Sequence, residues 1–137
     1  MRKMRVLIVD DNPEFLRSLS RVITHLPAVQ LAGTAESGEA CLEQLPALQP
    51  DIVLLDLAMP GLGGLETLKA IKARFPHIRV AMVSLHRVEA YRQTALQAGA
   101  DDFIFKNELY EHLPVLLGDY RGRPGEHPKN IDESPDE

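Results

Sequence analysis

Several polar residues stand where an apolar segment of this sequence ends. Asp10 and Asp11 follow "VLIV", and Asp56 closes the run "DIVLLD" (51–56). An ionised carboxylate is costly to bury unless it is paired or bound to a cation. Three carboxylates brought close together would also repel one another, and a cation relieves that repulsion. Oxygen ligands with open positions favour Mg²⁺, which keeps waters and accepts a substrate phosphate.

Two further residues of this kind are Ser84, which follows "AMV", and Lys106, which follows "DFIF". Beside the carboxylates, a lysine and a hydroxyl would hold phosphoryl oxygens while one carboxylate acts as the nucleophile. Each residue alone also has a plainer interpretation, as a helix cap, a turn residue or a solvated surface charge. Their combination favours phosphoryl-transfer chemistry at a magnesium site.

The rest of the chain alternates between short apolar runs and segments with helical spacing of apolar residues. This pattern predicts a strand and a helix repeated five times, hence a doubly wound parallel α/β sheet covered on both faces. Ligands bind such a sheet at the carboxyl ends of its strands, where the polar residues above should meet. The predicted strands span residues 4–9, 29–36, 51–56, 78–84 and 102–105. The predicted helices lie in residues 15–26, 38–48, 62–71, 88–99 and part of 108–120.

Local signals mark the helix boundaries. Asn12, followed by a proline, can cap the first helix, and Ser37 can cap the second. Gly99 stands where the fourth helix should turn at its C-terminus. Pro114 falls inside the last helical pattern and should end or kink that helix near Leu113.

The composition is that of a soluble globular protein, with 137 residues, 45% of them apolar and 26% charged. No apolar run is long enough to span a bilayer, and the N-terminus does not read as a signal peptide. The single cysteine, Cys41, excludes an internal disulfide, and the net charge of -5 argues against a nucleic-acid-binding surface. We expect a cytoplasmic protein with one domain over residues 1–120. Residues 121–137 lack apolar periodicity and are expected to form a disordered tail or a truncated linker.

The motifs "VLIVDDNP", "DIVLLDLAMPG", the serine of "AMVSLH" and "AGADDFIFK" make the sequence similar to response-regulator receiver domains of two-component signalling. The resemblance covers residues 4–119 and is strongest to receivers that precede helix-turn-helix output domains of the LuxR/NarL type. It implies a flavodoxin-like (βα)5 fold with the strand order 2-1-3-4-5. It also implies a signalling switch rather than an enzyme. A sensor histidine kinase, a phosphotransfer protein or a small acyl phosphate would phosphorylate it with Mg²⁺.

The resemblance assigns metal and acceptor roles to the acidic residues. Asp56 would be the phosphoacceptor. Asp11 and Asp56 would bind Mg²⁺ directly, together with the backbone carbonyl of Ala58, and Asp10 would act mostly through a bound water. The side chain of Ala58 is too small to position or block an attacking water.

On the phosphoryl side, the resemblance implies that Ser84 hydrogen-bonds the phosphoryl group and that Lys106 pairs with it. Phe103 falls at the position of the family's switch aromatic, although a plain core aromatic is the alternative interpretation. Asn107 stands where the family often has a proline after the lysine. The interruption at Pro114 argues against an output mode that relies on a full final helix.

Other functional classes fit the sequence less well. A phosphatase of the haloacid-dehalogenase type needs a second aspartate two positions after its nucleophile, where this chain has Ala58. A pseudo-receiver that acts only as an interaction module stays the alternative, although such modules usually lack an acceptor, acidic or lysine residue. A dinucleotide-binding domain would need a glycine-rich turn where "DDNPEF" stands.

The expected partners follow from the same resemblance. We expect no membrane contact and no DNA binding by this chain alone. Both a monomer and a homodimer are compatible with the sequence. A helix-turn-helix output domain is expected only if the chain is a fragment of a longer regulator.

Overall fold

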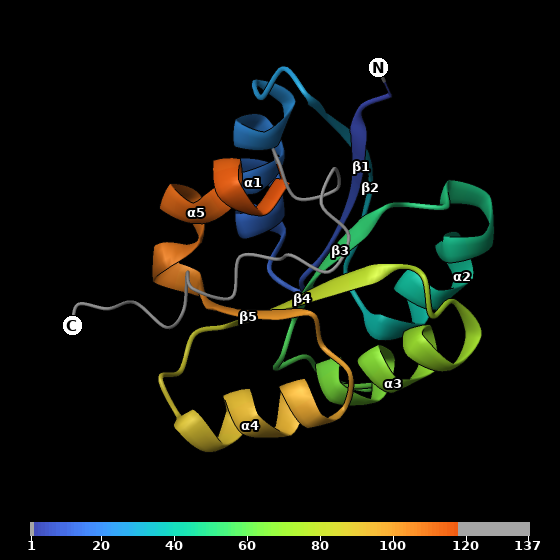
Figure 1. Ribbon diagram of the computed structural model, residues 1–137, viewed down its shortest axis with the longest axis vertical. Helices are drawn as coiled ribbons and strands as arrows, with labels where there is room; N and C mark the ends of the chain where they lie inside the picture. The colour runs from blue at the N-terminus through green and yellow to red at the C-terminus, as the bar shows by residue number, and fades with distance from the viewer. Residues whose placement is uncertain (1, 118–137) are drawn as a thin grey trace.

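The computed structural model describes residues 2–117, which alternate between strand and helix as expected (Figure 1). The strands are β1 (Met4–Val9), β2 (Val29–Ala35), β3 (Ile52–Asp56), β4 (Arg79–Ser84) and β5 (Asp102–Phe105). The helices are α1 (Pro13–Thr24), α2 (Gly38–Leu48), α3 (Gly64–Arg74), α4 (Glu89–Gln97), the short 3-10 helix η1 (Lys106–Glu108) and α5 (Leu109–Leu117). The predicted tail, residues 121–137, lies outside the described residues. Within residues 2–117, no helix is both long and apolar enough to cross a membrane.

The five strands form one parallel sheet in the order β2-β1-β3-β4-β5, which confirms the predicted strand order. Helices α1 and α5 cover one face of the sheet, and α2, α3 and α4 cover the other (Figure 1). This is the doubly wound α/β arrangement. The direction in which successive strands are added reverses between β1 and β3.

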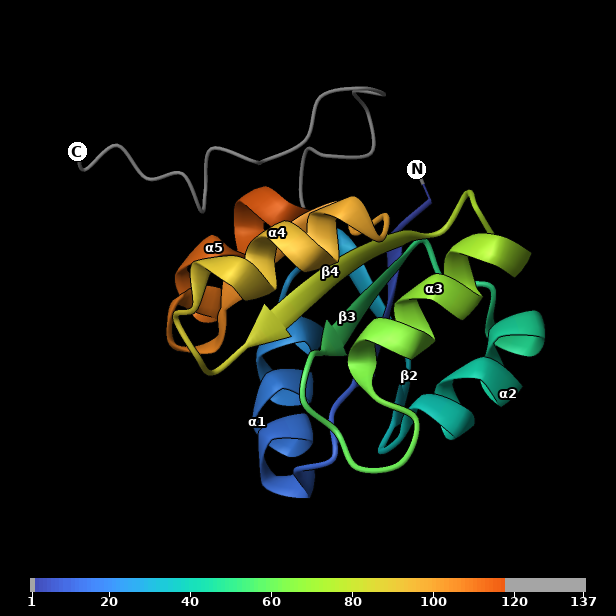
Figure 2. The ribbon, with the colours of Figure 1, turned by 90° about the horizontal axis from the view of Figure 1, so that it is seen from below.

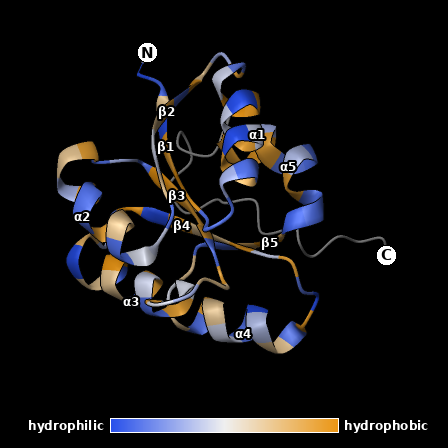
Figure 3. Cartoon of the chain, turned by 180° about the vertical axis from the view of Figure 1, so that it is seen from behind, coloured by the Kyte–Doolittle hydropathy of each residue, from blue (hydrophilic) through white to orange (hydrophobic). Residues whose placement is uncertain are grey.

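Alternate residues of each strand supply the two halves of the core. Val6 and Ile8 of β1 pack in the cluster under α1 and α5, whereas Leu7 and Val9 pack in the cluster under α2, α3 and α4. Both faces of the sheet are therefore buried, and all five residues of β3 are buried. Figure 3 shows the central strands as mostly hydrophobic and the helices as mixed. Burial on both faces explains why the central strands β3 and β4 read as continuous apolar runs rather than alternating ones.

The predicted helix caps are confirmed. The side chain of Asn12 accepts two backbone N–H groups of the first turn of α1, and Ser37 accepts one from the first turn of α2. Gly99 follows α4 with a φ of +111°, a backbone conformation that favours glycine. These caps satisfy N–H groups that would otherwise have no partner at the helix starts.

The sequence predicts that Pro114 ends or kinks the last helix near Leu113; the helix does not end there, because α5 continues through Pro114 to Leu117. Proline inside a helix removes one hydrogen bond and costs about 3 kcal/mol. Leu113, Leu116 and Leu117 are all buried against the sheet. Burying each leucine contributes roughly 1.5–3 kcal/mol, so together they offset the proline.

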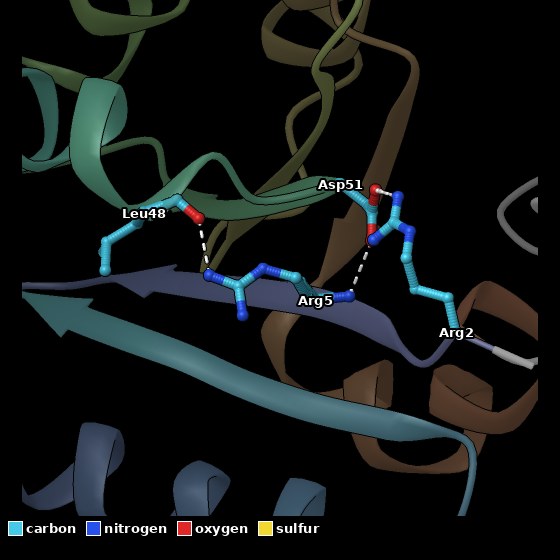
Figure 4. Close-up of polar contacts among 4 residues, drawn as sticks. All are labelled: Arg2, Arg5, Leu48 and Asp51. Carbon is cyan, nitrogen blue, oxygen red and sulfur yellow. Dashed lines mark hydrogen bonds and ion pairs between the residues drawn. The ribbon is translucent and has the colours of Figure 1, made fainter.

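At the amino-terminal edge of the sheet, Asp51 forms hydrogen bonds that connect three neighbouring strands (Figure 4). Its Oδ2 accepts the backbone N–H of Arg5 at 2.8 Å, and its carboxylate receives two bonds from the guanidinium of Arg2, at 2.8 and 3.2 Å. Its backbone N–H donates to the carbonyl of Arg5, and its carbonyl accepts from Arg79. One residue thus links the starts of β1 and β4 to the start of β3. Asp51 was expected to begin the strand, whereas β3 begins one residue later.

Candidate functional site

The carboxyl ends of four strands bring the predicted residues to one edge of the sheet. Asp56 and Ser84 are the last residues of β3 and β4, and Asp10 and Lys106 directly follow β1 and β5. Figure 2 shows the arrowheads of β3 and β4 directed toward the same side of the molecule. One cavity of about 430 Å³ is lined by Asp10, Asp11, Asp56, Ala58, Ser84 and Lys106, with segments 12–13 and 85–86 completing it.

The acidic residues form a compact cluster. One carboxylate oxygen from each of Asp10, Asp11 and Asp56 lies within 4.8 Å of the others. Asp10 and Asp56 are buried, whereas Asp11 is exposed to solvent. Oδ1 of Asp10 accepts the backbone N–H of Asn12 at 2.9 Å, which fixes the orientation of that carboxylate. The cluster therefore offers several oxygen donors on a surface that water can reach, the donor set that suits a hard divalent cation.

Burial raises the pKa of Asp56 to about 7, and the negative charges of Asp10 and Asp11 act in the same direction. The positive charge of Lys106 and a hydrogen bond from the backbone of Ala58 oppose that rise. Without a cation, a large fraction of Asp56 is therefore protonated at neutral pH. A cation in the cluster would favour the ionised form of this carboxyl group.

Lys106 forms an ion pair with Asp10, which follows β1 on the other side of Asp56. Its Nζ lies 2.8 Å from Oδ2 of Asp10, and only 11% of the lysine side chain is exposed. Because β1 and β5 are separated by β3 and β4, this ion pair crosses the mouth of the cavity. Lys106 therefore lines the same cavity as Asp56, while its ion pair is with Asp10.

Ser84 is buried at the end of β4, and its hydroxyl is engaged in a local turn. The Oγ accepts the N–H of His86 and donates to the carbonyl of His86, both at 3.1 Å. His86 and Leu85 line the cavity with Ser84. The hydroxyl can therefore reach a group in the cavity by exchanging its bond to the His86 carbonyl.

The loop after Asp56 is held at both ends. The N–H of Leu57 donates to the carbonyl of Val83 at 2.9 Å, and the N–H of Gly64 donates to the carbonyl of Leu57 at 3.1 Å. A Cβ atom at position 64 would lie 2.2 Å from the carbonyl oxygen of Asp56, so α3 can begin this close only with glycine. The backbone around Ala58 is fixed by this packing.

Phe103 lies apart from the cavity. Its side chain is fully buried in the core cluster under α2, α3 and α4. Its ring packs edge-to-face on Phe105, with 5.8 Å between the ring centroids. The structure thus brings six of the seven predicted site residues together and puts the seventh in the core.

Three contributors to the site are absent from the sequence prediction. His86 holds Ser84, and the carboxylate of Glu39 accepts the N–H of Leu62 in the loop after Asp56. The ring of Phe15 lies against Lys106. None of them ends a strand, and strand ends were the signal that revealed the other residues.

Comparison with known proteins gives consistent matches. The sequence model of the response regulator receiver domain matches residues 6–116. Response regulator GacA of Pseudomonas viridiflava is 36% identical over 103 residues, which cover 75% of this chain and 48% of GacA. A protein-glutamate methylesterase/protein-glutamine glutaminase of Geobacillus kaustophilus is 40% identical over 126 residues, covering 86% of this chain and 36% of that protein.

Among solved structures, the signal receiver domain of response regulator NarL from Mycobacterium tuberculosis superimposes with a TM-score of 0.75. It is 33% identical, and the match covers 82% of this chain and 94% of that domain. The similarity to NarL-type receivers that the motifs indicated is confirmed. The chain spans about half the length of the first curated relatives it matches.

Proposed function

The chain belongs to the response-regulator receiver family, and from this premise we propose that it is a phosphoacceptor signalling switch with Asp56 as the acceptor. The observation that carries the proposal is the cavity in which buried Asp56 meets Asp10, Asp11 and Lys106. A buried carboxylate among like charges is unfavourable by itself. A site that binds a cation and then a phosphoryl group explains why these residues converge.

Mg²⁺ fits the donor set of this site. Asp11, Asp56 and the backbone carbonyl of Ala58 would hold the ion, with Asp10 acting mostly through a bound water. The raised pKa of Asp56 supports this assignment, because a cation relieves both causes of the rise, burial of charge and repulsion from neighbouring carboxylates. Bound there, Mg²⁺ would favour ionised Asp56 and neutralise charge on the phosphoryl oxygens.

Asp56 acts as the nucleophile in the proposed reaction. Its carboxylate oxygen forms a bond to phosphorus while the bond from phosphorus to the donor breaks. That donor atom is an imidazole nitrogen of a phosphohistidine or the acyl oxygen of a small acyl phosphate, and it departs with the electron pair. In hydrolysis, a water oxygen attacks the phosphorus and the Asp56 carboxylate leaves. Ala58 offers no polar side chain to orient that water.

Lys106 and Ser84 recognise the transferred group. Phosphorylation brings roughly two negative charges and three acceptor oxygens to the strand ends. Lys106 would pair with these oxygens, and Ser84 would donate a hydrogen bond to them in place of its bond to His86. The loop after Ser84 would follow that movement and change the output face, with Phe103 as the switch aromatic in this proposal.

The proposal extends to partners. A sensor histidine kinase or a phosphotransfer protein is the proposed donor, and the cytoplasm is the proposed location. Homodimer formation and a helix-turn-helix output domain elsewhere in a longer protein are further parts of the proposal, which the motif resemblance to LuxR/NarL-type receivers implies. The match to a methylesterase, of which it covers 36%, indicates that relatives combine this fold with different outputs.

Intact-mass spectrometry with a small acyl phosphate tests the proposed function. We expect one phosphoryl group to be added when Mg²⁺ is present and none when it is chelated. Asp56→Asn should abolish the gain, whereas Glu43→Gln, which alters an exposed carboxylate on α2, should retain it. A wild-type protein that never gains the group would favour the pseudo-receiver alternative, in which the fold serves only as an interaction module.

A further inference from the structure

Phe15 lies face-on to the lysine of the site. The Nζ atom of Lys106 is 4.1 Å from the centroid of the Phe15 ring and 2.8 Å from Oδ2 of Asp10. A cation this close to a ring face is attracted by the negative potential of the π system. The ammonium group is therefore held by two partners, one an anion and the other an aromatic face.

The position of the Phe15 ring is itself fixed. Phe15 is in the first turn of α1, where its N–H and that of Glu14 donate to the capping side chain of Asn12. The N–H of Asn12 in turn donates to Asp10. The ring is partly buried and packs against the core cluster under α1 and α5. The hydrogen-bonded segment from Asp10 to Phe15 thus presents both partners of the lysine.

We propose that Phe15 is a positioning residue for Lys106, a role that rests on the proposed phosphoacceptor function. A lysine ammonium has three N–H donors on a flexible four-carbon stem. Asp10 and the ring of Phe15 occupy two sides of that group. The remaining side faces the cavity that Asp56 and Ser84 also line, where a phosphoryl oxygen would be bound.

The contact has a functional consequence because the stem of Lys106 is long. Without the ring, the ammonium would be free to sample more rotamers and would be hydrated on the side that Phe15 now covers. A phosphoryl oxygen would then have to reorder the side chain and displace that water. Phe15 therefore acts on the rate of phosphoryl transfer through Lys106, not by touching the phosphoryl group.

Substitutions of Phe15 distinguish the effect of its aromatic face from the effect of its apolar volume. We expect Phe15→Leu to lower the rate of Asp56 phosphorylation at saturating acetyl phosphate roughly 3- to 10-fold, in the range of a partly desolvated cation–π contact. Phe15→Tyr, which keeps the ring face, should stay within about twofold of wild type. The Mg²⁺ affinity should be unchanged in both variants. Phe75→Leu, which alters a ring at the end of α3, is the matched control and should leave the rate unchanged.

A leucine variant as fast as wild type would overturn the proposal, as would a tyrosine variant as slow as the leucine one. If Phe15→Leu does not fold, Phe15→Met gives the same comparison with a flexible apolar side chain. A second readout needs no phosphorylation. The ring should shift the NMR signals of the Lys106 ε-methylene protons upfield, and that shift should vanish in Phe15→Leu and persist in Phe15→Tyr.

The two readouts separate this inference from the proposed function. If wild type takes no phosphoryl group while the ring-dependent shift is present, the phosphoacceptor function fails and Phe15 still positions Lys106. If wild type is phosphorylated and the Lys106 signals are the same in Phe15→Leu, the positioning role is wrong and the phosphoacceptor function stands.

Discussion

Lys106 and Asp10 form an ion pair across the mouth of the site, with 2.8 Å between Nζ and Oδ2. The pair joins the residues that follow β1 and β5 and encloses Asp56, which ends β3 between them. It neutralises one of the three clustered carboxylates. We propose that a cation from solution offsets the negative charge of Asp11 and of ionised Asp56.

Mg²⁺ should stabilise the folded protein, because only the folded chain assembles the carboxylate cluster. A ligand that binds the native state alone raises the free energy of unfolding by about 2.7 kcal/mol at 100 times its dissociation constant. Thermal melts with and without Mg²⁺ measure this gain. Asp11→Asn should lose most of it, and an equal metal-induced shift in both proteins would show that Asp11 is not a ligand.

The stability of the metal-free protein should fall as the pH rises from about 4 to about 7. The pKa of Asp56 is about 7 in the fold, against an ordinary value of 3.8, so the folded state retains a proton that the unfolded state has released. Stability decreases with pH wherever the folded state binds more protons. The loss is complete above about pH 7 and amounts to at most about 4 kcal/mol.

Asp56→Asn removes this titration. Denaturant unfolding should show that the variant is more stable than wild type at pH 7.5 without Mg²⁺ and equal to it near pH 4. The order at pH 7.5 should reverse or close when Mg²⁺ is added. Parallel pH profiles for the two proteins would mean that Asp56 is not the group responsible.

Asp51→Ala should destabilise the fold more than Arg2→Ala does. The alanine leaves the partly buried backbone N–H of Arg5 without its 2.8 Å acceptor, which costs at most about 1–3 kcal/mol, the range for a buried donor. Arg2 makes a solvent-exposed ion pair, and such pairs contribute little. Urea unfolding of both variants measures the difference, with Asp51→Asn as a control that keeps an oxygen acceptor. A larger effect from Arg2→Ala would assign the stabilisation to the ion pair instead.

Ser84→Ala should leave Asp56 able to accept a phosphoryl group but uncouple it from the loop and helix that follow. Phe103 is already fully buried, so its rotation supplies no further gain from burial in this state. A hydrogen bond from Ser84 to the charged group contributes about 1.5–3 kcal/mol. A complete population shift needs about 5.5 kcal/mol, so we expect both states to be populated in wild type.

Beryllofluoride, a phosphoryl analogue, allows this coupling to be measured by NMR. Wild type should show chemical-shift changes at Phe103 and over residues 86–98, and Ser84→Ala should lose them. Arg87 in that loop is ion-paired with Glu108 of η1, so signals at this pair report the same movement. An unchanged pattern in Ser84→Ala would show that another residue carries the coupling.

The site could be predicted from the sequence because the carboxyl ends of parallel strands all lie at one edge of the sheet. Asp56 and Ser84 end β3 and β4, and Asp10 and Lys106 directly follow β1 and β5. Once the fold is known, these four residues must therefore lie at the same edge of the sheet. The fold was predictable because the central strands β3 and β4 are buried on both faces and because capping side chains mark the starts of α1 and α2.

The contacts made by these residues were not predictable. The pairing of Lys106 with Asp10 and its contact with Phe15 depend on side-chain rotamers and on the angle at which α1 leaves β1. For a related reason, the sequence could not show that α5 continues as a helix beyond Pro114. Local propensity penalises that proline, whereas the burial of Leu113, Leu116 and Leu117 depends on tertiary packing.

Chemical trapping tests most directly whether Asp56 itself receives the phosphoryl group. Borohydride reduces an aspartyl phosphate to homoserine, which peptide mass spectrometry locates in the sequence. After reaction with acetyl phosphate and Mg²⁺, we predict homoserine at position 56 and at no other aspartate. Homoserine at another position, or a phosphorylated protein that yields none at position 56, would contradict the assignment of Asp56 as the phosphoacceptor.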